Sequence, residues 1–163
     1  MILRVFFFLI TFQVCSQSFQ DIRLEFPFIE GKDRVESYIS ILESDDEVLV
    51  QGYLAVMYFF YSKESLNPFV KLKYFNKGKE LLDDCIFRKS RSVELRYLRF
   101  GIQTQVPSFL GYNNRIESDF EYIVENIEEE DLSLRIKKKI IDDLILIPDL
   151  EPSKVEQLKQ IKL

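Results

Sequence analysis

The sequence predicts an all-α fold of antiparallel helix pairs, and three observations support this prediction. Apolar residues recur at three- and four-residue spacing through most of residues 33–162, as they do on one face of a helix. No segment shows the sustained alternation of apolar and polar residues that is typical of a strand. Glycine, proline and short polar clusters divide the pattern into lengths typical of helices. We therefore expect a single all-helical domain over residues 17–163.

The expected helices lie between these breaks. Their ranges are 33–42, 46–63, 67–87, 92–105, 114–127, 132–146 and 153–162. The residues before them, 17–30, are expected to form a short lead-in. Because the connections are short, neighbouring helices are expected to pack antiparallel.

Three of the expected helix starts carry capping residues. Asn67 followed by Pro68 is typical of a helix N-terminus. Asn114 with Glu117 three residues later has the spacing of a capping box. The polar residues 44–46 are expected to cap the helix that follows them.

The first residues have the pattern of a signal peptide. One positive charge precedes an apolar run at residues 5–15, which is much shorter than the roughly 20 residues that span a bilayer. Val14 and Ser16 suit the positions three residues and one residue before a cleavage in front of Gln17. We expect a signal peptide at residues 1–16, a mature chain that is exported to the periplasm or secreted, and no transmembrane helix in that mature chain.

Two alternatives to cleavage are open for this segment. Cys15 is a possible lipidation site, although the residues before it make a poor lipobox, in which a small residue directly precedes the cysteine. In the second alternative, the segment is kept and forms a buried, amphiphilic first helix.

Composition restricts the function classes. The chain has 27 acidic and 22 basic residues, a net charge of −5 at pH 7, and no histidine or tryptophan. An acidic chain is unsuited to non-specific nucleic-acid binding, which needs clustered lysine and arginine. Without histidine there is no histidine-based triad, histidine-ligated zinc or haem, or side-chain proton shuttle of the usual kind. We expect no cofactor and no metal, and a protein that is not an enzyme.

Removal of the signal peptide changes the charge and the thiol content of the chain. Residues 1–16 contain one basic residue, Arg4, and no acidic one, so their removal shifts the net charge from −5 to −6. Cys15 leaves with them, and Cys85 is then the one remaining cysteine. An intramolecular disulfide is therefore excluded. With no histidine to activate its thiol, Cys85 is expected to be a small buried residue.

The middle of the chain shows a repeat-like pattern. Ala55 and Tyr58 share one helix face, and Gly78 and Cys85 place small residues on the face of the next helix. Small residues that let two helices approach are typical of tetratricopeptide repeats. The expected link between these helices is about eight residues longer than in the standard repeat, and Ser90 stands where proline is usual. The later helices supply two further pairs, and the alternative is an irregular helical array without a true repeat.

Three segments also carry a family resemblance. They are 67–83 (NPFVKLKYFNKGKELLD), 94–103 (ELRYLRFGIQ) and 107–113 (PSFLGYN). They resemble an uncharacterised family of small exported, tetratricopeptide-like proteins of Bacteroidota-type bacteria, over roughly residues 35–145. The resemblance implies export and a helical-repeat architecture, and it supplies no catalytic residues.

A candidate partner-binding groove comes from basic and aromatic residues. Arginines one turn apart can hold a carboxylate bidentately, and tyrosines next to them supply rigid contact area. The candidate residues are Arg96, Arg99, Gln103, Tyr97 and Tyr74. An acidic peptide, a chain terminus or an anionic sugar would suit such a groove.

The alternative for these arginines is structural. On this interpretation Arg96 and Arg99 pair with Glu94, Glu117 or Asp119 and hold adjacent helices in register.

The loop at residues 107–114 has unusual content. Gly111 permits a positive φ, and we expect Gly111→Ala to be destabilising for that reason. Phe109, Leu110 and Tyr112 are large apolar residues in an expected surface connection. They either fold back as a plug over the helix ends or present a binding edge.

The expected function is that of an exported, non-catalytic helical-repeat module that binds a protein or peptide partner. The alternative is a carboxylate-based hydrolase or carbohydrate-acting protein of the cell envelope, because two carboxylates about 5 to 10 Å apart can cleave glycosides. The acidic run at residues 128–131 is expected to be a solvated turn, and the pairs at 83–84 and 142–143 do not demand a site.

Overall fold

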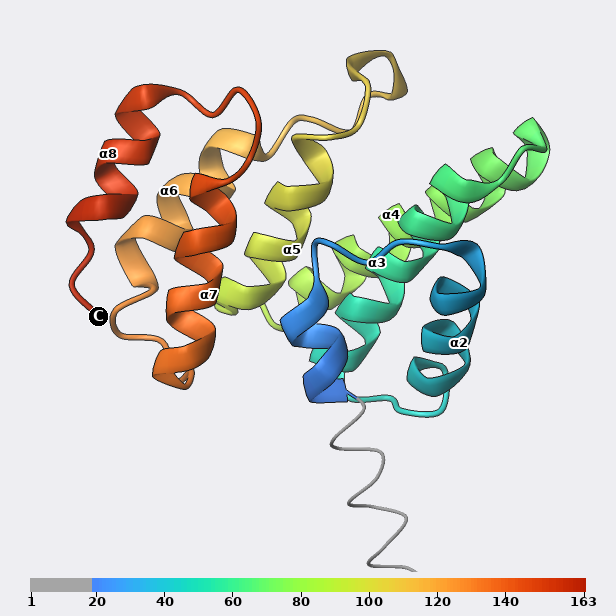
Figure 1. The fold of residues 1–163 in the computed structure, drawn as a ribbon, viewed down its shortest axis with the longest axis horizontal. Helices are drawn as coiled ribbons and strands as arrows, with labels where there is room; N and C mark the ends of the chain where they lie inside the picture. The colour runs from blue at the N-terminus through green and yellow to red at the C-terminus, as the bar shows by residue number, and fades with distance from the viewer. Residues whose placement is uncertain (1–18) are drawn as a thin grey trace, which may run out of the picture.

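The computed structural model describes residues 19–163, and every regular element in this range is a helix (Figure 1). The all-α prediction is confirmed. The elements are α2 (Lys32–Leu42), α3 (Val48–Glu64), α4 (Pro68–Arg88), α5 (Val93–Gln103), the 3₁₀ turn η1 (Ser108–Leu110), α6 (Ile116–Asn126), α7 (Leu134–Ile145) and α8 (Pro152–Gln160). No end of an expected helix moves by more than two residues. The predicted signal peptide and Cys15 lie outside the described residues.

The helices stack in pairs on either side of α5. α3 packs most extensively on α4, α2 covers α3, α5 packs on α6, and α7 packs on α8. Figure 1 shows α5 between the α2–α4 half and the α6–α8 half. Ten of the eleven residues of α5 are buried, which is why its polar residues need partners inside the protein. No helix within residues 19–163 is long and apolar enough to cross a membrane.

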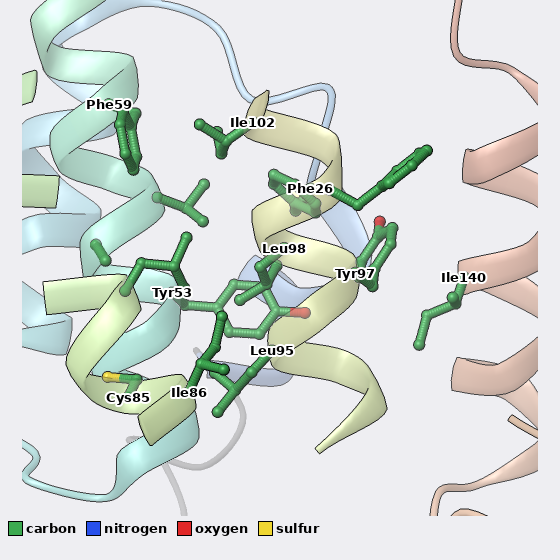
Figure 2. Close-up of a cluster of buried hydrophobic side chains, with 14 of the residues drawn as sticks. Phe26, Tyr53, Phe59, Cys85, Ile86, Leu95, Tyr97, Leu98, Ile102 and Ile140 are labelled. Atoms are coloured by element: carbon green, nitrogen blue, oxygen red, sulfur yellow. The ribbon is translucent and has the colours of Figure 1, made fainter. Parts of the chain in front are cut away.

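The hydrophobic core runs through both halves of the array. Figure 2 shows Tyr53 and Phe59 of α3, Leu98 of α5 and Ile140 of α7 in one buried cluster. Cys85 lies in the same cluster as a free, fully buried thiol, as expected. Burial raises the pKa of its thiol to about 11, so Cys85 is protonated at neutral pH.

Residues 19–25 are helical, which the sequence analysis did not predict. Phe19 meets the ring of Tyr53 edge to face at 5.4 Å, and Ile22 and Phe26 are almost completely buried. The expected lead-in is therefore part of the core. Its apolar residues at positions 19, 22 and 26 have helical spacing, but the polar residues among them masked that pattern.

The α3–α4 pair shows the predicted close approach at Gly78. A Cβ atom there would lie 2.8 Å from the carbonyl oxygen of Ala55 and 2.9 Å from the ring of Phe59. Only residues 65–67 link the two helices, so the prediction of a long link is wrong. The excess over the roughly 34 residues of a standard repeat lies in the helices themselves, which have 17 and 21 residues.

The helix caps agree in part with the expectations. Asn67 accepts hydrogen bonds from the backbone N–H groups of Phe69 and Val70, as predicted. At α3 the cap is Glu47, one residue beyond the expected polar cluster. The capping box at Asn114 is wrong, because α6 begins two residues later and its N-terminus has no side-chain cap.

A long-range contact takes the place of that capping box. The Arg115 N–H donates to the side-chain oxygen of Gln103 at 3.2 Å, so α5 satisfies this donor. Glu117, the other expected member of the box, instead forms an ion pair with Lys154 of α8 at 2.8 Å.

Candidate binding groove

Arg99 is held by carboxylates inside the protein. Its guanidinium donates to both carboxylate oxygens of Asp119, at 2.6 and 2.8 Å, and to Asp83 at 3.2 Å. Asp119 is completely buried, and the Arg99 side chain is 9% exposed. This bidentate pair holds α5 against α6, as the structural alternative expected.

Arg96 joins the same cluster from the edge. It donates to Asp119 at 2.9 Å and to the carbonyl oxygen of Ser90 at 3.0 Å. Its guanidinium carbon lies 4.0 Å from the ring centroid of Tyr122. The other two acidic residues considered as partners, Glu94 and Glu117, pair with different basic residues.

The remaining predicted groove residues face other parts of the fold. Tyr97 is buried and donates its hydroxyl to Asp143 of α7, whereas buried Gln103 is bonded to the start of α6. Tyr74 lies on α4 against the rings of Tyr58 and Tyr61. The structure therefore brings Arg96 and Arg99 together and places the other three apart. Partner binding by all five residues stays a prediction. Such binding would require Arg99, Tyr97 and Gln103 to lose their buried contacts within the protein.

A second polar cluster fixes residues 19–30 to the array. Glu94 of α5 accepts from Arg23 at 2.7 and 2.9 Å and from the hydroxyl of Tyr53 at 2.7 Å. Lys139 of α7 donates to the carbonyl oxygen of Phe26 and to Asp143. Burial raises the pKa of Tyr53 and Tyr97 well above the ordinary value, so both donate as neutral phenols.

An open apolar groove of about 470 Å³ lies at the other end of α5. It is formed by the end of α3, the start of α4, the end of α5 and the turn η1. The lining residues are Phe59, Phe60, Ser62, Lys63, Pro68, Lys71, Leu72, Phe75, Ile102, Gln105, Val106, Pro107, Phe109 and Leu110. Its volume lies within the roughly 300 to 1,000 Å³ that small-ligand sites occupy.

The loop at residues 107–114 divides its aromatic residues between plug and rim. Tyr112 is buried, stacks on Phe59 at 5.7 Å and donates its hydroxyl to Asp83 at 3.2 Å. Phe109 is 84% exposed and lines the groove. Gly111 ends η1 with φ 63°, the left-handed conformation that was expected of it. The loop thus buries Tyr112, as the plug alternative expected, and leaves Phe109 exposed at the groove.

Apolar exposure continues along α4 beyond the groove. Leu72 is 53% exposed, Phe69 is 83% exposed, and Leu66 in the α3–α4 link is fully exposed. These residues are three apart in the sequence and none of them belongs to the buried face of α4. The sequence did not single out these three residues, because helical spacing alone does not distinguish an exposed apolar side chain from a buried one. Exposure of large apolar side chains in one place is typical of interaction surfaces.

Some of the acidic residues singled out from the sequence accept hydrogen bonds from side chains of the protein itself. Asp83 accepts from Arg99, and Asp143 accepts from Tyr97 and Lys139. Residues 127–131 form the expected turn. Within residues 19–163 no group of three or more acidic or cysteine side chains is placed to hold a metal ion.

No protein-family model, curated protein or solved structure matches the chain. The resemblance to exported proteins of Bacteroidota-type bacteria therefore stays a prediction.

Proposed function

We propose that the protein is an exported, non-catalytic helical-repeat module that binds a segment of a partner protein in the apolar groove. The observation that carries this proposal is a groove of about 470 Å³ whose rim includes the exposed side chains of Leu72 and Phe109. Binding that covers these side chains would remove apolar surface from water, which is favourable.

The floor of the groove supports binding because it is rigid. Phe75 meets the ring of Phe59 edge to face at 5.4 Å, and Tyr112 stacks on Phe59 at 5.7 Å and meets Phe75 at 6.2 Å. Tyr112 is fixed in turn by its hydrogen bond to Asp83. A preformed aromatic floor loses little conformational entropy on binding, so more of the contact energy appears as affinity.

Two observations support the non-catalytic part of the proposal. The chain has no histidine, and the buried carboxylates of Asp119 and Asp143 are bound by arginine or lysine. Carboxylate oxygens occupied by these ion pairs are not free to act on a substrate in this conformation. The hydrolase alternative gains no support from this arrangement.

The experiment compares two variants as bait in an envelope-fraction pull-down. Leu72→Ser with Phe109→Ser removes two apolar residues of the rim. Phe87→Ser is the matched control, since Phe87 is 85% exposed at the opposite end of α4 and does not line the groove. Each captured protein is then purified, and its affinity for the three baits is measured by calorimetry.

We expect the double substitution to weaken binding by about 30-fold or more, as for the loss of interface hot spots, and the control to match wild type. The exported bait is expected to begin at Gln17. Equal affinities for wild type and the double variant would refute the groove, and an exported bait that begins at Met1 would refute the signal peptide.

A further inference from the structure

Building on the proposed function, we infer that the bound segment is acidic as well as apolar. Its bulky apolar side chains enter the groove, and its aspartate or glutamate side chains face Lys63 and Lys71. The two lysines belong to the lining itself, and they come from different helices, α3 and α4.

The charge of the groove is opposite to that of the chain. None of the fourteen lining residues is acidic, although the protein has 27 acidic residues and a net charge of −5. Residues 63–79 contain five lysines and one glutamate. A cationic apolar site in an acidic protein attracts acidic apolar segments and repels basic ones.

The two groove lysines have no acidic partner within the described part of the chain. The ion pairs of residues 19–163 include Lys77 with Glu43 at 3.8 Å, but none that involves Lys63 or Lys71. Their ammonium groups are therefore free to receive a carboxylate. A rim carboxylate at each lysine would strengthen binding by up to about fivefold.

The extent of the apolar surface favours a protein segment over a small amphiphile. Leu66 and Phe69 are almost fully exposed beside the groove, and Phe109 is 84% exposed at its rim. A ligand confined to the groove would leave Leu66 and Phe69 in water. A segment with several apolar anchors would cover them as well, in the manner of a peptide laid along a hydrophobic groove.

The experiment is selection from a random peptide phage library on the full chain. Three baits are compared: wild type, the charge-reversed pair Lys63→Glu with Lys71→Glu, and the control pair Lys138→Glu with Lys159→Glu. The control lysines are exposed on α7 and α8, away from the groove. Circular dichroism checks that all three baits are equally helical.

We expect wild type and the control to enrich peptides in which bulky apolar residues lie beside aspartate or glutamate. The charge-reversed bait is expected to enrich lysine and arginine instead. In synthetic versions of the selected peptides, exchange of the acidic residues for asparagine and glutamine should weaken binding to wild type by about tenfold.

The failures of this inference and of the proposed function are distinguishable. Selected peptides that need Leu72 and Phe109 but show no charge preference would overturn the inference and leave the groove standing. If wild type selects no peptide, both are overturned. Sedimentation with phosphatidylglycerol vesicles that depends on Lys63 and Lys71, without peptide selection, would assign the surface to lipid and also overturn the inference.

Discussion

At the scale of single residues, the fold depends on polar side chains that are buried together with their partners. Asp119 is completely buried and is bound by two arginines of α5. Such an ion pair contributes little net stability compared with an apolar pair, but loss of one partner leaves a buried charge without compensation. The arginines are therefore structural in this conformation.

Substitution of Arg99 tests this role. We expect Arg99→Ala to lower the free energy of unfolding by about 3 kcal/mol, because Asp119 loses its bidentate partner. Arg96→Ala should cost less, about 1 kcal/mol, since Arg96 contributes a single hydrogen bond to Asp119. Urea denaturation followed by circular dichroism measures both. If Arg99→Ala unfolds at the wild-type midpoint, the arginine is free for binding, as the predicted arginine groove requires.

At the scale of elements, helix positions could be predicted from the sequence and their lateral contacts only in part. Periodicity, with proline and glycine at the breaks, fixed the helix ends to within two residues. The helix at residues 19–25 was missed because polar residues among Phe19, Ile22 and Phe26 concealed the helical spacing of these apolar residues. The groove was missed because it forms where the ends of three helices and η1 come together. Local sequence patterns predict the helices but not these contacts between them. Exposure of Leu72 and Phe109 is a property of the assembled array.

The α3–α4 contact offers a test at this scale. We expect Gly78→Ala to destabilise the protein by about 1 to 3 kcal/mol, because its Cβ would lie 2.8 Å from the Ala55 carbonyl oxygen. Gly111→Ala is the comparison. The space around Gly111 is open, but its φ is 63°. A residue with a Cβ atom is strained in this conformation, so we expect the substitution to destabilise the protein by about 1 kcal/mol. Asparagine tolerates this conformation and should restore stability at position 111 and not at position 78. Thermal melts that rank Gly78→Ala as neutral would contradict the close packing of α3 on α4.

At the scale of the whole molecule, the two polar clusters of α5 join the halves of the array. Asp119 and Asp83 connect α5 to α6 and α4, while Glu94 and Asp143 connect it to residues 19–30 and α7. Tyrosine hydroxyl groups complete several of these links. Burial raises the pKa of Tyr53, Tyr58, Tyr97 and Tyr112 above the ordinary value of about 10.

These raised pKa values predict instability at high pH. In the unfolded chain the tyrosines ionise near pH 10, whereas in the folded protein the buried ones keep their protons. The folded state therefore holds more protons above pH 10, so the stabilisation is complete below that pH and is lost as the pH rises. We expect absorbance at 295 nm to show only some of the eight tyrosines ionising before unfolding. A titration in guanidinium chloride, where all eight should ionise together, is the control. One common transition near pH 10 in native buffer would contradict the buried clusters.

The apolar groove is the proposed binding site. Its most direct test is nuclear magnetic resonance of the ¹⁵N-labelled protein during titration with a peptide that the wild-type chain selects. We predict amide shifts at the end of α3, at the start of α4 and over residues 105–110, with the side-chain Nε resonances of Arg96 and Arg99 unchanged. Shifts confined to Arg96, Arg99 and their neighbours on α6, with none in the groove, would contradict it.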